Sequence, residues 1–290
     1  GIYVLYSYAS FSRIADPYFR GVILASAAIA LVAFLDDLRD WPFTVKLAAQ
    51  VLAALAAVGS GLYIRAYSVP YLGLVDIGWL GPVATIAWIL FATNAMNFID
   101  GLDGLAPGVA LIAAAFLAFI AQQESGWFVY FAALLLAAGL AGFLPFNYPR
   151  ARIFMGDVGS QFCGFVLAVL GVAASRFTGV QLSFLIVPML LSGVLFDVAF
   201  TLVRRAIERE RLTEPHRGHL YQLAQRAGVP AHTVAAVHWG FAAFGGVCCL
   251  AFIEAPAWWK PEIALLPLLP QLSWVILVRQ RADRAGIRVW

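Results

Sequence analysis

Long apolar stretches recur along the whole chain of 290 residues. Hydrophobic residues make up 62% of the chain and charged residues 12%, whereas a typical soluble domain is roughly 45–50% apolar and about 25% charged. A helix that crosses a bilayer needs about 20 mostly apolar residues. Candidate spans lie near residues 21–35, 45–62, 79–99, 105–121, 127–144, 158–175, 181–203, 233–253 and 261–278, with a partial one at the start. The sequence therefore predicts an all-α polytopic membrane protein with about ten transmembrane helices in one domain, residues 1–290.

Cysteine usage and net charge exclude several other classes. Cys163, Cys248 and Cys249 lie in apolar stretches without a Cys-x-x-Cys pair, so neither a zinc site nor a disulfide framework is indicated. The formal net charge is only +3. Because no soluble domain carries a basic stripe, we expect no nucleic-acid partner.

Loop charges predict the orientation in the membrane, because cytoplasmic loops carry an excess of Lys and Arg. If the loop at 36–44 is cytoplasmic, helix alternation assigns to that side Arg39, Lys46, Arg150, Arg152, Arg204, Arg205, Arg209, Arg211, Arg217, Arg226, Arg279, Arg281, Arg284 and Arg288. The opposite side has only Arg13, Arg20, Arg65, Arg176 and Lys260. The same alternation brings polar clusters at residues 36–40, 94–103, 147–157 and 216–219 to the cytoplasmic face, where we expect the active site.

The first polar cluster is the pair Asp36-Asp37 at the end of an apolar segment. Charged side chains at the bilayer are costly and usually functional. Repulsion between neighbouring carboxylates can raise the pKa of one of them and suit it to proton transfer. Such carboxylates also suit Mg²⁺, which takes oxygen ligands. A solvated helix end is the structural alternative for this cluster.

The second cluster repeats polar residues at every third position: Asn94, Asn97, Asp100 and Asp103. Neighbouring members of such a series share a helix face, but each step drifts by roughly 60°. Glycines at 101 and 104 indicate that the helix ends there and the chain turns. The carboxylates and amides could then converge on one ligand. A polar helix cap would explain one Asp but not all four positions.

The third cluster runs from Asn147 to Asp157. Asp157 directly precedes an apolar helix, so we expect it either to cap that helix or to bind a metal. Gly156 and Gly159 would let a phosphate approach the backbone at the helix N-terminus.

The fourth cluster is His216-Arg217-x-His219, within a basic loop at residues 204–232. Two histidines and an arginine in four residues form a compact set of donors for a diphosphate. A zinc site is the alternative, but no nearby Cys or third His supports it. Asp197, near Arg204 and Arg205, is predicted with equal weight to form a buried ion pair or to be catalytic.

Taken in this order, the clusters resemble the polyprenyl-phosphate N-acetylhexosamine-1-phosphate transferases. The resemblance extends from Leu35 to about Gln222, through Asp-Asp, Asn-x-x-Asn-x-x-Asp-Gly-x-Asp-Gly, Phe-Asn-x-x-Pro, Phe-Met-Gly-Asp-x-Gly-Ser and the His loop. The form His-Arg-x-His-x-Tyr-Gln is similar to the branch that initiates O-antigen. The family's first helix and Gly-rich first loop are absent, and the chain starts at Gly1. We therefore expect an N-terminally truncated fragment.

The resemblance implies a role for each matching residue. Asp36, Asp37 and Asp157 are the implied catalytic carboxylates; Asp37 and Asp157 are also the implied ligands of Mg²⁺, with Mn²⁺ as an alternative. The implied substrate-binding residues are Lys46, Asn94, Asn97, Asp100, Asp103, Asn147, His216, Arg217 and His219. Whether Asp36 acts as a base or as a nucleophile stays open.

The implied reaction transfers a sugar-1-phosphate, of an N-acetylated amino sugar, from a UDP-sugar to undecaprenyl phosphate and releases UMP. The resemblance places such an enzyme in the bacterial inner membrane with its active site facing the cytoplasm, and leaves a homodimer open. Two alternatives remain: a UbiA-like Mg²⁺-dependent prenyltransferase, and a multi-pass transporter. A CDP-alcohol phosphatidyltransferase is disfavoured because Asp100-Gly101 is not followed by Ala-Arg.

Overall fold

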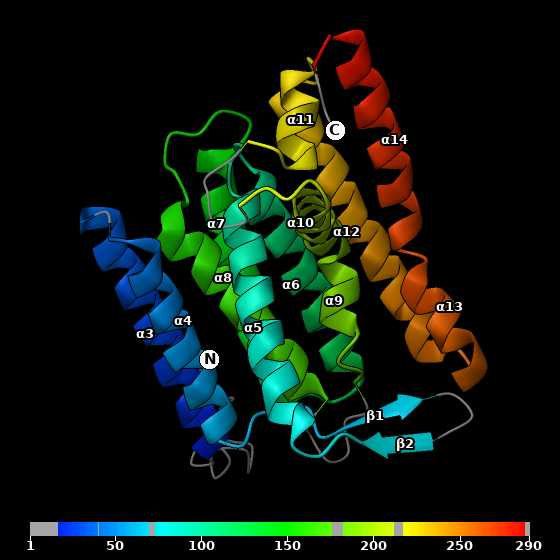
Figure 1. The fold of residues 1–290 in the computed structure, drawn as a ribbon. Helices are drawn as coiled ribbons and strands as arrows, with labels where there is room; N and C mark the ends of the chain where they lie inside the picture. The colour runs from blue at the N-terminus through cyan, green and yellow to red at the C-terminus, as the bar shows by residue number, and fades with distance from the viewer. Residues whose placement is uncertain (1–16, 40, 70–72, 176–181, 212–216, 288–290) are drawn as a thin grey trace.

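The computed structural model describes residues 17–39, 41–69, 73–175, 182–211 and 217–287, and within them the chain forms a helical bundle (Figure 1). Its helices are α3 (Pro17–Arg39), α4 (Phe43–Gly59), α5 (Leu80–Ile99), α6 (Leu105–Gln123), α7 (Trp127–Asn147), α8 (Gly156–Ala174), α9 (Ile186–Leu190), α10 (Ser192–Ile207), α11 (Leu220–Arg226), α12 (Ala231–Glu254), α13 (Lys260–Leu265) and α14 (Leu268–Arg284). A 3-10 turn, η1 (Ala257–Trp259), precedes α13.

The helices confirm an all-α polytopic membrane protein, with seven segments long and apolar enough to cross a bilayer in the described part of the chain. Two other predicted spans are present in altered form. The segment at 45–62 is the 17-residue helix α4, and the segment at 181–203 is divided at Leu191 between α9 and α10. The predicted partial span at the start of the chain lies outside the described residues.

A small β-hairpin is the exception to the all-helical architecture. Strand β1 (Ala66–Val69) pairs antiparallel with β2 (Gly73–Asp76), with Ala66 opposite Asp76. The hairpin joins α4 to α5 and lies at the end of the bundle opposite α11 (Figure 1). Neither strand was predicted from the sequence.

Helices α6 and α8 are the most deeply buried of the candidate spans and form the centre of the bundle. Small residues let the neighbouring helices approach closely, as is common where helices pack in a membrane. A Cβ at Gly164 of α8 would lie 2.9 Å from the Thr93 Cα of α5, and one at Gly108 of α6 would overlap the Trp239 ring of α12. The close α5–α8 contact matters for function because both helices carry polar residues at one end.

Helix alternation brings the polar ends of these helices together. The C-terminal ends of α3, α5, α7 and α10 and the N-terminal ends of α4, α6 and α8 all lie at the end of the bundle where α11 packs (Figure 1). The predicted gathering of distant motifs at one end is thus present in the described residues.

Candidate active site at one end of the bundle

The aspartate pair at the end of α3 lies against the start of α8. Asp37 Oδ1 accepts a hydrogen bond from the backbone N–H of Asp157 at 3.3 Å, and its Oδ2 accepts one from Val158 N–H at 3.4 Å. Gly156 has φ +64°, and a Cβ there would lie 2.7 Å from Asp37 Oδ2. Asp37 therefore caps α8 from another helix. The expectation that Asp157 itself caps α8 is wrong, because Asp157 is the second residue of the helix.

Lys46, on the first turn of α4, joins the aspartates. Its Nζ lies 2.5 Å from Asp36 Oδ2 and 2.9 Å from Asp157 Oδ2. Asp36 is buried, and its other oxygen accepts a hydrogen bond from Trp41 N–H. One ammonium group thus links carboxylates that are 121 positions apart in the sequence.

Asp157 receives side-chain donors from three helices. Asn97 of α5 donates to Oδ1 at 2.9 Å, while Lys46 of α4 and Gln161 of α8 itself donate to Oδ2 at 2.9 and 3.2 Å. Asn97 also contacts Ser160 Oγ at 3.0 Å. These contacts hold the Asp157 carboxylate in one orientation at the edge of a cavity.

Oxygens of Asp36, Asp37 and Asp157 all lie within 4.8 Å of one another, so these residues could hold a metal ion. Carboxylate oxygen is the donor that Mg²⁺ and Mn²⁺ prefer. This donor set, with the cluster partly open to solvent, fits a hard divalent cation, which the sequence predicted at Asp37 and Asp157.

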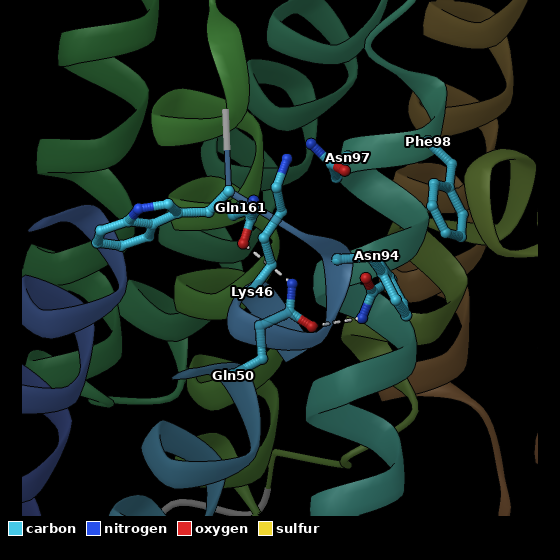
Figure 2. Close-up of a pocket in the computed structure, with 8 residues that line it drawn as sticks. Lys46, Gln50, Asn94, Asn97, Phe98 and Gln161 are labelled. Atoms are coloured by element: carbon cyan, nitrogen blue, oxygen red, sulfur yellow. Dashed lines mark hydrogen bonds between the residues drawn. The ribbon is translucent and has the colours of Figure 1, made fainter. Parts of the chain in front are cut away.

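A buried polar network extends from this cluster into the bundle, as Figure 2 shows. Gln50 donates to Gln161 Oε1 at 3.0 Å and accepts a hydrogen bond from Asn94 at 2.7 Å. Gln50, Gln161 and Ser160 were not predicted as functional residues from the sequence. A signal was available, because Gln50 follows Lys46 and Gln161 follows Asp157 by four positions, which places each pair on one helix face.

A second group of predicted residues lines a cavity of about 260 Å³ beside Asp157, and this group includes Asn97, Asp100, Asp103 and Asn147. Asp100 follows the last residue of α5. Burial, together with the charges of Asp157 and Asp37, raises the pKa of the Asp100 carboxyl to about 7. Three of the four residues in the motif, Asn97, Asp100 and Asp103, therefore line one cavity, whereas Asn94 lines a smaller one.

Asp103 and Asn147 are also bound to the backbone. Asn147 accepts a hydrogen bond from Gly104 N–H at 2.7 Å and donates to Ile153 O at 2.9 Å. Asp103 Oδ2 accepts one from Ala151 N–H at 3.0 Å. Both side chains fix the segment between α7 and α8, so the geometry gives them a positioning role in addition to any substrate contact.

The basic loop approaches this site through α11. His219 precedes α11 and is buried, with its Nδ1 3.1 Å from Asp197 Oδ1. The Tyr221 hydroxyl donates to Phe98 O at the end of α5, at 3.0 Å. Arg217 is exposed, and His216 lies outside the described residues. Neither residue lines a described cavity, but Arg217 is exposed and His219 is buried, so within the described part of the chain Arg217 is the more accessible of the predicted diphosphate contacts.

Asp197 is buried in α10, and its partners lie at the start of α11. Its carboxylate accepts hydrogen bonds from Leu220 and Tyr221 N–H, each at 3.0 Å, in addition to its contact with His219. Arg204 donates to Gly218 O, and Arg205 binds Glu210. The buried charge thus fastens α11 to α10 through His219 rather than through the neighbouring arginines.

Comparison with known proteins shows the family of the chain. The chain belongs to glycosyl transferase family 4, whose family model matches residues 19–175, more than half of the chain. The match includes the Asp36 to Asp157 clusters, while Asp197 and the His loop lie beyond it. The family is the one that the motifs indicated, that of the polyprenyl-phosphate hexosamine-1-phosphate transferases.

Individual relatives carry names of this kind. A probable undecaprenyl-phosphate N-acetylglucosaminyl 1-phosphate transferase of Bacillus subtilis is 31% identical, over 72% of this chain and 58% of that protein. A decaprenyl-phosphate N-acetylglucosaminephosphotransferase of Mycobacterium tuberculosis is 30% identical, over 80% and 63%. A phospho-N-acetylmuramoyl-pentapeptide-transferase of Lactobacillus gasseri is 34% identical, over 53% and 52%. The chain thus spans between about half and two thirds of the length of these relatives.

Proposed function

We propose that the protein transfers a sugar-1-phosphate from a UDP-sugar to undecaprenyl phosphate. An oxygen of the lipid phosphate attacks the sugar-linked phosphorus of the nucleotide sugar, the bond from that phosphorus to the bridging oxygen breaks, and UMP leaves with that oxygen. The products are undecaprenyl-diphosphate-sugar and UMP. The observation that carries the proposal is the gathering of five polar side chains at one end of the bundle, where two of them, Asn97 and Asp157, line a cavity. The five are Asp36, Asp37, Lys46, Asn97 and Asp157.

Asp37 and Asp157 are the proposed holders of Mg²⁺, with Mn²⁺ as a substitute, and Asp36 lies beside them. The ion supplies charge neutralisation for the diphosphate when it is bound. Asp36 and Asp37 stand at the end of a membrane helix, which suits them to orient the phosphate of a lipid. Asn97 holds Asp157 in place through its amide.

Donor binding is assigned to the cavity at the end of α5. Asp100 and Asn97 line it directly, together with Asp103 and Asn147, which also order the segment before α8. Asn94 lines the smaller neighbouring cavity with Lys46 (Figure 2). Arg217, with His216 and His219, is assigned to the diphosphate. The names of the relatives support an N-acetylated amino sugar, and the form of the His loop supports the first step of a cell-envelope glycan such as O-antigen.

The test is an assay of UMP release by purified protein supplied with undecaprenyl phosphate and a panel of UDP-sugars. UMP should form only when both substrates and Mg²⁺ or Mn²⁺ are present, and EDTA should stop its formation. Asp157→Asn purified in parallel is the matched control for contaminating activity. Full turnover in excess EDTA, or UMP release that ignores the lipid phosphate, would contradict the proposal.

The active site is proposed to face the cytoplasm of a bacterial inner membrane, because the basic residues gather at its end of the bundle. The native cysteines are buried, so a single new surface cysteine gives a clear label. Glu208→Cys at the site end should react with a membrane-impermeant maleimide only after the cells are opened. Asp76→Cys in the hairpin should react in intact cells. The reverse pattern would show that the active site faces away from the cytoplasm.

A further inference from the structure

Every carboxylate oxygen of the Asp36, Asp37 and Asp157 cluster already accepts a hydrogen bond. Asp37 is occupied by the backbone N–H groups of α8, and Asp36 by Trp41 N–H and Lys46. Asp157 is occupied by Asn97 on one oxygen and by Lys46 and Gln161 on the other. A cation that binds this cluster must therefore displace at least one of these donors.

Lys46 is the donor whose position conflicts most with a bound cation. It is the one charged donor among those described for the cluster, and its Nζ lies 2.9 Å from Asp157 Oδ2. Magnesium-type ions bind carboxylate oxygens at roughly 2.0–2.1 Å, so an ammonium sharing that oxygen would lie against a doubly charged ion. The Asn97 and Gln161 amides do not carry this repulsion.

Lys46 is also able to move. A lysine ammonium sits on a flexible four-carbon stem, and this side chain is 24% exposed. It lines a cavity of about 120 Å³ together with Gln50, Asn94 and Asn97, as Figure 2 shows. The backbone donors that hold Asp37 have no comparable freedom, because they belong to the first turn of α8.

We propose that Lys46 is the built-in counter-ion of Asp36 and Asp157, and that its ammonium leaves Asp157 when a divalent cation binds there. This inference rests on the metal site of the proposed function. The ammonium neutralises the cluster without metal and is set free beside the cavities when metal binds. Because coupling between two ligands is reciprocal, an anionic phosphate that receives the Lys46 ammonium would tighten metal binding.

The test is Mn²⁺ binding to the purified protein in detergent, measured by the loss of the free-ion signal in electron paramagnetic resonance. Lys46→Gln removes the competing charge and should tighten Mn²⁺ binding by about tenfold or more. Lys46→Arg keeps the charge and should bind close to wild type. Arg39→Gln removes an exposed charge at the same end of the bundle and should change the affinity by less than about threefold.

The outcomes separate this inference from the proposed function. If Asp157→Asn abolishes Mn²⁺ binding while Lys46→Gln leaves it unchanged or weaker, the proposed release of Lys46 by the metal is wrong and the metal site stands. If wild type and Asp157→Asn bind Mn²⁺ alike, the proposed metal site is wrong, and the proposed release of Lys46 by the metal is wrong as well. A cooperative melting transition for each variant shows that the affinities refer to folded protein.

Discussion

Two carboxylates at the same end of the molecule, Asp157 and Asp197, each accept several hydrogen bonds but differ in what surrounds them. Asp157 is partly exposed, and its donors are side chains from α4, α5 and α8. Asp197 is 1% exposed, and its nearest donors come from the consecutive residues 219–221. The number of hydrogen bonds therefore does not distinguish a reactive group from an anchor, whereas access and the mobility of the donors do.

The largest expected effect concerns Asp157. Asp157→Asn keeps the size of the side chain but removes the charge that binds Lys46 and that is proposed to bind the metal, so UMP release should fall roughly 1000-fold. The melting temperature should stay near that of wild type, because the buried contacts of Asp197 that hold α11 are unchanged. Retained activity together with a large drop in stability would reverse the roles assigned to the two aspartates.

Asp197→Ala should act through stability. It leaves His219 and two backbone N–H groups buried without their acceptor, a loss of roughly 3 kcal/mol or more for a buried charged partner. Denaturant unfolding should report this loss, while Mn²⁺ affinity stays as in wild type because α8 is untouched. Weakened Mn²⁺ binding in a folded Asp197 variant would show that Asp197 and the Asp157 cluster are coupled.

The two loop residues Arg217 and His219 should also differ, one affecting activity alone and the other affecting both activity and stability. Arg217→Ala should lower kcat/KM by about 100-fold, the loss expected for one preorganised donor, without a change in melting temperature, since Arg217 is exposed. His219→Ala should lower both kcat/KM and the melting temperature, since His219 is buried against Asp197. Values of kcat/KM within a few-fold of wild type for both variants would place leaving-group stabilisation on the metal alone.

Asp100 gives the smallest effect. Its pKa is raised to about 7 in the folded protein by burial and by two neighbouring carboxylates, so the folded state binds more protons than the unfolded state between about pH 4 and 7. Stability in metal-free buffer should therefore fall as pH rises through this window. Asp100→Asn should melt a few degrees above wild type at pH 8, with little difference at pH 4. An equal difference at both values would refute the assigned ionisation.

Much of the site could be predicted because helix alternation is a strong constraint. Apolar stretches of suitable length place Asp37, Asn97 and Asp157 at the same end of the bundle, and the structure confirms that they meet. The Lys46 bridge could not be predicted from spacing, since it depends on how α4 rotates against α3 and α8. The break at Leu191 and the hairpin were hidden for a similar reason: local hydropathy does not record how helices and loops pack.

The partner of Asp197 shows the limit most clearly. Arg204 and Arg205 are the basic residues nearest to it in the sequence, and a buried ion pair was one of the two roles expected for Asp197. The carboxylate instead contacts residues 219–221, which are more than 20 positions away, and the sequence does not indicate that they return to α10. Proximity along a helix is thus a weak guide to the partner of a buried charge.

The proposed reaction transfers a sugar together with its phosphate, and the fate of that phosphorus tests the proposal directly. Purified protein would be given undecaprenyl phosphate and a UDP-sugar labelled with ³²P at the sugar-linked phosphorus. We expect the label to move into the lipid fraction in step with UMP release, and the UMP to carry none. Label that remains in water-soluble UDP while the sugar enters the lipid would show transfer of the sugar alone and would contradict the account.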